Sequence, residues 1–355
     1  MIKLGDICNI LNGRNQKKVE DINGKYPIYG SGGIMGYAND YICKAGTTII
    51  GRKGSINKPL YVNTEFWNVD TAFGLQPKEC CHSRFLYYLC KSIDFTRYDK
   101  GVTIPSLVKS DLLQIPIDIP SFEKQSQIVE ELDQLSNIIE KQRQQLSELD
   151  NLAQSIFYDM FGDPVTNEKG WDVKKLKDIA ISQIGLTYKP DNVSENGTIV
   201  LRSSNIQDSS LDFADIVRVN CNIKEKQYVQ EGDILMCSRN GSFRLVGKVA
   251  RIKNLRERMS YGAFMTIIRS NYQDYLFAFF KSPAFREQLI SAQTATINQI
   301  TVKMLDEIIL PLPPMELQQL FAQKIEAIEQ EKEIIKQSIA ETEELFNSRM
   351  DYYFG

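Results

Sequence analysis

The sequence is poor in the residues on which most enzyme mechanisms depend. It has one histidine, His82, in 355 residues, which leaves little room for histidine acid–base chemistry or a Ser-His-Asp triad. Its seven cysteines form no C-x-x-C pair, and the adjacent Cys80 and Cys81 have no second cluster to complete a zinc site. We therefore expect reduced thiols in a cytosolic protein, with no bound metal.

Long apolar runs are also missing. No run approaches the length needed to span a membrane, and the first residues, 1–6, lack the apolar core of a signal peptide. The hydrophobic content of 43% and charged content of 25% are typical of a globular protein. We expect a cytoplasmic chain with two domains and no membrane partner.

The common catalytic motifs are absent together. The glycines of 30–36 do not have the G-x-G-x-x-G spacing, and the loop 46–53 has Arg52 and Lys53 where a phosphate-binding loop needs Lys and then Ser or Thr. The segment 312–315, Leu-Pro-Pro-Met, lacks the residues that flank Pro-Pro in an adenine methyltransferase. No nuclease arrangement stands out, so we expect a chain without catalytic residues or cofactor of its own.

An internal repeat is the most informative feature that is present. Residues 104–162 reappear 193 positions later as 297–355, and 4–7 (Leu-Gly-Asp-Ile) recurs as 176–179 (Leu-Lys-Asp-Ile) at an offset of 172. The difference of 21 indicates an insertion in the middle of the second copy. The first-copy residues that meet the same type at +193 include Ile104, Leu112, Ile115, Pro120, Glu123, Gln125, Glu140, Gln144, Glu148, Leu152, Ser155, Phe161 and Gly162.

The repeated segments predict two long helices, at 121–162 and 313–355. Apolar residues recur in steps of four and three from Ile128 onward, which is a heptad pattern, and Gly162 and Gly355 suit the helix ends. About 40 residues at about 1.5 Å each make a rod of about 60 Å. We expect the copies to pair as an antiparallel coiled coil; the alternative is that each helix packs only on its own domain.

Charge is segregated along the chain. Residues 122–162 and 315–355 each carry a net charge of −5, whereas residues 1–121 carry +4 and 163–314 carry +3. Basic heads suit a polyanion such as DNA, although glutamate-rich helices are also common in solvent. The heads, 1–120 and 172–312, read as mixed α/β and are joined through a linker at 163–171. Strands are expected at 47–51, 60–63, 115–119, 198–201, 233–237 and 264–268, with short helices at 84–92 and 275–282.

Polar loops in both heads are candidates for binding DNA. Arginine can contact guanine with two donors and asparagine can pair with adenine, whereas lysine suits phosphates. The alternative for each loop is a solvated turn. The candidates are Ser31, Arg52, Lys53, Ser55, Asn57 and Lys58 in the first head, and Arg202, Ser203, Ser204, Asn205, Arg239, Asn240, Ser242, Arg244 and Lys248 in the second.

These features together resemble the specificity subunit of a type I restriction-modification system. The resemblance is carried by residues 119–125 (Ile-Pro-Ser-Phe-Glu-Lys-Gln) and 312–318 (Leu-Pro-Pro-Met-Glu-Leu-Gln), by Met-Phe-Gly-Asp-Pro at 160–164, and by Tyr29–Gly36 with Gly51–Ser55. It is also carried by Gly-Asp-Ile-Leu at 232–235 and Ser-Arg-Asn-Gly at 238–241, and it covers the whole chain.

The resemblance implies a non-enzymatic subunit with two target-recognition domains, each reading one half of a split double-stranded DNA sequence. The helical spacer would fix the gap and bind two modification subunits, which methylate adenine with S-adenosylmethionine. Restriction subunits would add ATP- and Mg-dependent translocation and cleavage. The rivals are a coiled-coil scaffold protein and a stand-alone DNA methyltransferase or nuclease. Lys332, Thr342 and Arg349 interrupt the second heptad pattern; either they face the modification subunits or the rod is less regular there.

Overall fold

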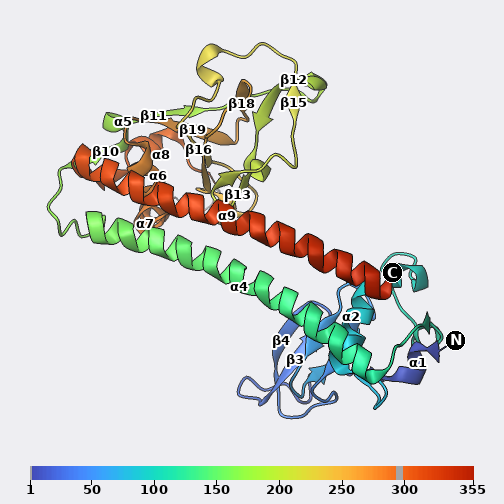
Figure 1. Cartoon of the computed structure of the whole chain (residues 1–355). Helices are drawn as coiled ribbons and strands as arrows, with labels where there is room; N and C mark the ends of the chain where they lie inside the picture. The colour runs from blue at the N-terminus through green and yellow to red at the C-terminus, as the bar shows by residue number, and fades with distance from the viewer. Residues whose placement is uncertain (1, 293–298) are drawn as a thin grey trace. The chain divides into compact units, whose positions relative to one another are not determined.

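The computed structural model describes residues 2–292 and 299–355, so Ile297 of the repeat lies outside the described residues. The chain divides into two compact units, Met1–Gln144 with Ile335–Gly355, and Gln145–Ile334. Each unit contains one head and one part of each long helix (Figure 1). The predicted domains divide the chain differently, and their boundaries stay a prediction.

The first unit has a mixed α/β head. A four-stranded antiparallel sheet has the order β2-β8-β5-β6, and a three-stranded sheet has the order β4-β3-β7 with β3 and β7 parallel. A further antiparallel pair, β1 with β9, joins the first and last strands of the head. The elements are β1 Ile2–Lys3, α1 Leu4–Ile7, β2 Cys8–Asn12, β3 Tyr26–Gly30, β4 Gly33–Ala38, β5 Thr47–Gly51, β6 Leu60–Val62, β7 Trp67–Asn68, β8 Ala72–Pro77, α2 Ser83–Ser92, η1 Phe95–Tyr98, α3 Lys109–Leu113, β9 Pro116–Ile117 and the beginning of α4 Phe122–Phe161.

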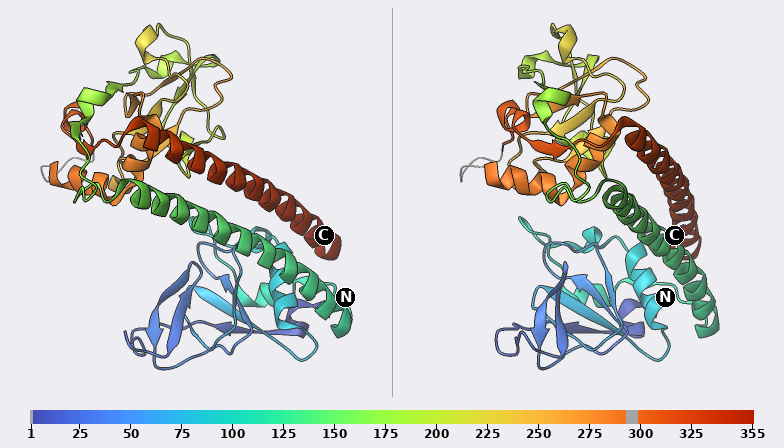
Figure 2. Two further views of the ribbon diagram at one scale, coloured as in Figure 1. Left: turned by 60° about the vertical axis from the view of Figure 1, so that its left-hand side comes forward. Right: turned by 90° about the vertical axis from the view of Figure 1, so that its left-hand side faces the viewer.

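Strand β5 lies at the centre of this head and is buried on both faces. Successive side chains of a strand point to opposite faces. Ile50 accordingly joins the core formed with α2 and α4, and Ile49 joins a smaller cluster with Cys43 and Phe66 on the other face. In both views of Figure 2, the strands of this unit lie on one side of the first part of α4.

The second unit repeats this topology with a different sequence. Its sheets have the orders β11-β19-β16-β17 and β15-β12-β18, with β12 and β18 parallel, and β10 pairs with β20. The elements are β10 Val173–Lys175, α5 Leu176–Ile179, β11 Ile181–Ile184, η2 Pro190–Asn192, β12 Val193–Leu201, η3 Ser203–Asn205, β13 Ile206–Gln207, β14 Ser210–Leu211, β15 Arg218–Val219, η4 Glu225–Gln227, β16 Ile234–Cys237, η5 Phe243–Leu245, β17 Val249–Arg251, β18 Met259–Tyr261, β19 Met265–Arg269, α6 Gln273–Lys281, α7 Pro283–Ala292, α8 Val302–Asp306, β20 Ile309–Pro311 and part of α9 Met315–Phe354.

The matching strand orders extend the internal repeat through both heads. Strand β16 is the counterpart of β5: Met236 packs on the core that α6 forms with the long helices, and Leu235 packs on the opposite face. The segment between β12 and β15 contains η3, β13 and β14, whereas β3 and β4 are joined by two residues. The predicted mixed α/β fold with an internal repeat is confirmed, and this segment contributes to the predicted insertion.

Most predicted strands and short helices are present with small shifts. The prediction for 47–51 coincides with β5, the strands predicted at 60–63 and 233–237 are each one residue shorter, and the strand predicted at 264–268 is moved by one residue to Met265–Arg269. The prediction for 115–119 shrinks to Pro116–Ile117 because only these residues pair with β1. Strand β12 extends upstream of the predicted 198–201, where it pairs with β15 across an irregular register.

Both predicted long helices are present, and the repeated glutamine explains how each begins. The Gln125 side chain is buried at the start of α4, where its Nε2 donates to the carbonyl oxygen of Pro120 at 3.0 Å. The Gln318 Nε2 donates to Pro313 O at 2.7 Å in the same way. At the other end of α4, Gly162 has φ +77° and donates to Tyr158 O at 2.8 Å, which is the predicted left-handed closure.

The two helices pair antiparallel within the first unit. Gln142 Nε2 donates to Ser338 Oγ at 2.6 Å, and Glu131, which precedes Gln142 in α4, binds Arg349, which follows Ser338 in α9. Arg349 Nη2 and Tyr353 Oη donate to Glu131 Oε2 at 3.0 and 2.6 Å. The polar residue Arg349 therefore lies against α4, and its contact with a modification subunit stays a prediction.

The same antiparallel pairing occurs within the second unit. Phe157 and Phe161 of α4 pack on Phe321 of α9, with ring centroids 6.0 and 5.0 Å apart. Lys332 is buried, with Nζ 3.0 Å from Asp150 Oδ1 of α4 and 3.1 Å from Glu329 Oε1. Burial lowers the pKa of Lys332, but these carboxylates outweigh it and the net pKa is raised. Lys332, like Arg349, therefore binds a carboxylate of α4.

Candidate nucleic-acid interface

The first basic loop is fixed to the end of β5 by backbone hydrogen bonds. The amides of Arg52 and Lys53 donate to Thr71 O at 2.9 and 3.2 Å. The Arg52 guanidinium lies 5.8 Å from the Phe73 ring centroid and donates to Asp70 O at 3.3 Å. Among the described residues neither Arg52 nor Lys53 has an ion pair, and both are exposed. Their charges are therefore available to an anionic partner.

Ser31 occupies the tip of a hairpin that contacts the same turn as Arg52. Ser31 and Gly32 connect β3 to β4, with Gly33 at φ +118°. Val69 N donates to Tyr29 O at 3.0 Å, one residue before the end of β3. The turn formed by residues 69–71 thus joins the Ser31 hairpin to the basic loop, two segments that the sequence separates by about 20 residues.

Asn57 has a structural role in this head. Its Oδ1 accepts from Phe95 N at 2.7 Å, and its Nδ2 donates to Asp94 Oδ1 at 2.8 Å. Hydrogen bonds from Thr96 and then from Asn57 lower the pKa of Asp94 to about 2. Ser55 and Lys58, on either side of Asn57, are exposed. The DNA-binding role of Asn57 stays a prediction, but its amide is already occupied within the protein.

The second head holds its basic loop in the same way. The amides of Ser238 and Arg239 both donate to Phe264 O, at 2.9 and 3.1 Å. Ser238 therefore corresponds to Arg52, and Arg239 corresponds to Lys53, which the sequence alone did not align. The Arg239 guanidinium lies 5.3 Å from the Phe264 ring and is exposed, as are Ser242 and Arg244.

Two polar clusters of the second head meet although they are far apart in sequence. Asn240 Nδ2 donates to Ser203 Oγ at 3.2 Å, and Asn240 Oδ1 accepts from Ser242 N at 3.0 Å. Lys248 Nζ donates to Ile206 O at 2.7 Å, on the segment that follows Ser203. Since 203–206 lies between β12 and β15, the insertion of the second copy adds residues to its basic loop.

Asn205 and Arg202 hold this inserted segment together. The Asn205 side chain is buried, accepts from Arg202 N at 2.8 Å and donates to Asp212 O and Asp215 O, both at 2.9 Å. Arg202 Nη2 lies 2.6 Å from Asp215 Oδ2. Hydrogen bonds from Ser204 and then from Arg202 lower the pKa of Asp215. The predicted DNA contacts of these residues stay untested, and the Arg202 charge is compensated.

Sequence reasoning missed the groups that support both loops. The Thr71 and Phe264 carbonyl oxygens and the Phe73 ring carry no motif. A further segment, Lys100–Ser106, also lies against the first basic loop: Lys53 and Ser106 form an isolated antiparallel bridge. Gly101 is a weak sequence signal for this segment, because a Cβ there would collide with the Ile104 carbonyl oxygen.

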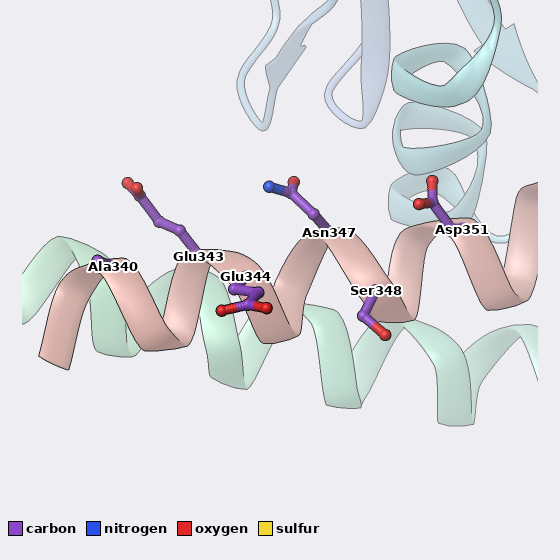
Figure 3. Close-up of a pocket in the computed structure, with 6 residues that line it drawn as sticks. All are labelled: Ala340, Glu343, Glu344, Asn347, Ser348 and Asp351. Atoms are coloured by element: carbon purple, nitrogen blue, oxygen red, sulfur yellow. The ribbon is translucent and has the colours of Figure 1, made fainter.

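Two hollows lie outside these loops. In the second unit a groove of about 1130 Å³ is lined by charges of both signs, among them Arg251, Lys253, Glu257 and Glu326. A shallow hollow lies along α9, where Figure 3 shows carboxylates of Glu343, Glu344 and Asp351 on the helix surface. In both hollows the acidic residues of the lining outnumber the basic ones, which is the opposite of a DNA-binding surface.

Within 2–292 and 299–355, no group of three histidine, cysteine or acidic side chains is placed to hold a metal ion. Over the same residues, every helix is too short or too polar to cross a membrane. Burial raises the pKa of the Cys8, Cys43 and Cys81 thiols to about 12, so these cysteines are poor nucleophiles at neutral pH.

Comparison with known families gives one strong match. The family model for the type I restriction modification DNA specificity domain matches residues 1–150 and 168–344. The chain is 29% identical over 169 residues to the EcoKI specificity subunit of Escherichia coli K12, covering 45% of this chain and 36% of that protein. It is 21% identical to the MjaVIII specificity subunit of Methanocaldococcus jannaschii, covering 93% of this chain and 85% of that protein.

The match to the EcoKI specificity subunit spans about a third of that protein's length. Two solved structures share the fold over nearly the whole chain. One is the type I restriction-modification S subunit from M. genitalium, with a TM-score of 0.61, 15% identity and coverage of 98% of this chain and 94% of that one. The other comes from work on complex assembly of the type I restriction-modification system, with a TM-score of 0.57, 17% identity and coverage of 99% and 96%.

Proposed function

Because this chain belongs to the family of type I restriction modification DNA specificity domains, we propose that it recognises a split DNA sequence, one half with each head. The first basic loop, with Arg52 and Lys53, reads one half. The second, with Arg239, Asn240 and the adjoining Ser203, reads the other. Arginine and asparagine supply donors for base edges, and the remaining lysines supply charge for phosphates.

One observation carries this proposal. Two heads of the same topology and different sequence present a cationic loop at the same place, each held by two backbone amides on one carbonyl oxygen, Thr71 O or Phe264 O. Recognition of two different half-sites requires the same backbone support in both heads and different side chains on the loops. Because the halves differ, the target need not be a palindrome, unlike the sites of symmetric dimers.

In this proposal the helices α4 and α9 set the gap between the half-sites. They are stiff elements of 40 residues each, and they pair antiparallel within each unit through Glu131–Arg349 and Asp150–Lys332. Their net negative charge would keep them away from the phosphates. Their outer surfaces, including the acidic face of Figure 3, remain available for partner subunits.

The partners in this proposal follow the family. Two modification subunits would bind the helices and methylate adenine with S-adenosylmethionine, and restriction subunits would supply ATP- and Mg-dependent cleavage. The chain itself would be a cytoplasmic, non-catalytic subunit that holds no cofactor. Its raised thiol pKa values and its lone histidine support this division of labour.

The experiment compares genomic adenine methylation in cells with and without this gene, when both express the modification subunit. The expected result is one bipartite methylated sequence that disappears when the gene is deleted. Methylation that persists without the gene would contradict the proposal.

Two further measurements separate the rival functions. S-adenosylmethionine binding by the isolated chain would favour a stand-alone methyltransferase, and we expect none. A scaffold protein would bind DNA weakly and without sequence preference, whereas we expect specific binding that weakens steeply with salt.

A further inference from the structure

We propose that the loop Lys100–Ser106 is a second recognition element of the first head, in which Val102 and Ile104 detect thymine through its 5-methyl group. The inference rests on the proposed function and adds residues that the cationic loops do not include. It adds an apolar contact with DNA beside the polar DNA contacts proposed for Arg52 and Lys53.

The loop Lys100–Ser106 is attached directly to the first basic loop. Lys53 and Ser106 form an antiparallel bridge. Gly54 N donates to Pro105 O, and Leu107 N donates to Arg52 O, both at 2.9 Å. A duplex that contacts Arg52 and Lys53 would therefore also meet the residues between Lys100 and Ser106.

The loop has a defined conformation of its own. Asp99 Oδ1 accepts from both Gly101 N and Ser106 N at 2.7 Å, and Lys100 N donates to Ser106 O at 2.9 Å. The backbone amides of Ser106 and then Gly101 lower the pKa of Asp99, which keeps this clamp ionised at neutral pH. Since the loop is already ordered, little conformational entropy would be lost when it binds.

Two side chains of this loop are both apolar and exposed. Val102 is fully exposed, at 102% of its reference area, and Ile104 is 61% exposed. A single exposed apolar residue needs no explanation. These two, however, share one short loop beside Arg52 and Lys53, which have no ion pair with any residue that the structure describes. Both are β-branched and therefore stiff, which suits a fixed contact surface.

The chemistry of Val102 and Ile104 selects thymine. Neither side chain has a hydrogen-bond donor or acceptor, so neither can read the polar edges of guanine, cytosine or adenine. The apolar group that base pairs display in the major groove is the thymine methyl. Contact with that methyl would remove apolar surface of both partners from water.

The second head has the same junction. Arg239 and Gln299 form an antiparallel bridge, and Ile300 N donates to Ser238 O at 2.7 Å. Gln299 and Ile300 are the repeat counterparts of Ser106 and Leu107, at +193. The repeated frame therefore holds the basic loop in both heads, which supports a functional role for this junction.

The test is selection of bound sequences from a random duplex pool by the complex of the full chain with its modification subunit. Wild type is compared with the double variant Val102→Ser/Ile104→Ser, which removes every methyl group of both side chains, because a threonine methyl could still contact thymine. We expect the variant to lose preference for thymine, by about fourfold per methyl contact, at one or two positions of one half-site. The matched control Ile22→Ser alters a side chain in the same head that is 91% exposed and should leave the motif unchanged.

A second measurement uses the wild-type protein alone. Deoxyuridine in place of thymine removes only the 5-methyl group, and at the affected positions it should weaken wild-type binding by a similar factor. The double variant should bind both duplexes equally. A motif that the variant shares with wild type, or equal binding of thymine and deoxyuridine duplexes by wild type, overturns the inference.

Other outcomes are also decisive. Loss of the modification subunit from the variant with no change in motif would assign the loop to protein docking and overturn the inference. A wild-type complex that enriches no bipartite motif would instead contradict the proposed function, on which the inference depends.

Discussion

At the scale of single residues, hydrogen-bond partners separate side chains that support the loops from those available to DNA. Asn205 and Asn57 use their amide groups inside the protein. Arg52 and Arg239 are exposed and lie near aromatic rings. Arg52 uses one N–H on Asp70 O, and its guanidinium has further N–H donors for a ligand. This difference guides the choice of residues for mutation.

Asn205→Ala should destabilise the second unit. The change removes three hydrogen bonds of a buried side chain and leaves the carbonyls of Asp212 and Asp215 without that donor. We expect the free energy of unfolding to fall by about 2–4 kcal/mol, measured by urea denaturation. The matched control Ser242→Ala changes an exposed residue nearby and should cost less than about 0.5 kcal/mol. Equal stability of wild type and Asn205→Ala would refute this structural role.

Asn57→Ala should change the acid stability of the first unit. The folded-state pKa of Asp94 is about 2, below its unfolded value of about 3.9, so its ionisation favours folding above pH 4. That contribution is lost as the pH falls from about 4 to about 2. Without the Asn57 amide the Asp94 pKa rises, so the variant should have a lower melting temperature at pH 7.

The difference between the two melting temperatures should shrink as the pH falls through this window, to the part caused by the lost hydrogen bond from Phe95 N. Melting curves from pH 7 to pH 2 provide the measurement, with Lys58→Ala as the control that should show no such convergence. A difference for Asn57→Ala that stays constant with pH would contradict the assigned coupling to Asp94.

The sequence predicted the loops at this scale but not their supports. Arginine, lysine and asparagine between glycines are visible in the sequence because the side chains themselves carry the signal. The carbonyl oxygens of Thr71 and Phe264 carry none, since every residue has one. The pairing of Asn240 with Ser203 depends on tertiary folding of an insertion and has no local pattern.

At the scale of elements, the two long helices owe their defined starts to one repeated side chain. Gln125→Ala should weaken the start of α4, since the buried amide accepts from His82 N at 2.8 Å and donates to Cys80 O and Pro120 O at 3.0 Å each. We expect a loss of about 2–4 kcal/mol in the free energy of unfolding, measured by denaturation. Gln134→Ala, at an exposed position of the same helix, should have almost no effect; equal losses for both variants would refute the assignment.

The heptad pattern predicted both helices and their antiparallel pairing but not the positions of their polar residues. Lys332 and Arg349 interrupt the apolar steps in sequence, which from sequence alone indicates either a face for modification subunits or a less regular rod. In the structure each binds a carboxylate of α4, Asp150 or Glu131. An apolar pattern describes one helix at a time, so it contains no information about the charge that the facing helix presents. Buried polar pairs of this kind can fix register.

At the scale of the whole molecule, the account requires that the heads act separately. Arg52→Ala and Arg239→Ala should each relax the recognised sequence in a different half-site, because each removes guanine donors worth about 1–3 kcal/mol of discrimination from one head. Methylation sequencing of the two variant strains provides the measurement. Changes in the same half-site from both variants would contradict the assignment of one head to each half.

The fold class and the internal repeat could be predicted from the sequence because many residues along the chain carry the same signal, in the heptad steps and the repeated segments. The offsets of 193 and 172 located the insertion, but its content, η3 with β13 and β14, depends on pairing between distant residues. The correspondence of Arg239 with Lys53 also needed coordinates, since the loops share composition and not an alignable sequence.

The most direct test of the central claim is the gap itself. One heptad inserted into each long helix, after Gln144 in α4 and after Ile334 in α9, lengthens each rod by about 10 Å, which is the rise of about three base pairs. Methylation sequencing of the resulting strain should reveal the two wild-type half-sites separated by a gap about three base pairs longer. Unchanged half-sites at the wild-type spacing would show that α4 and α9 do not set the distance.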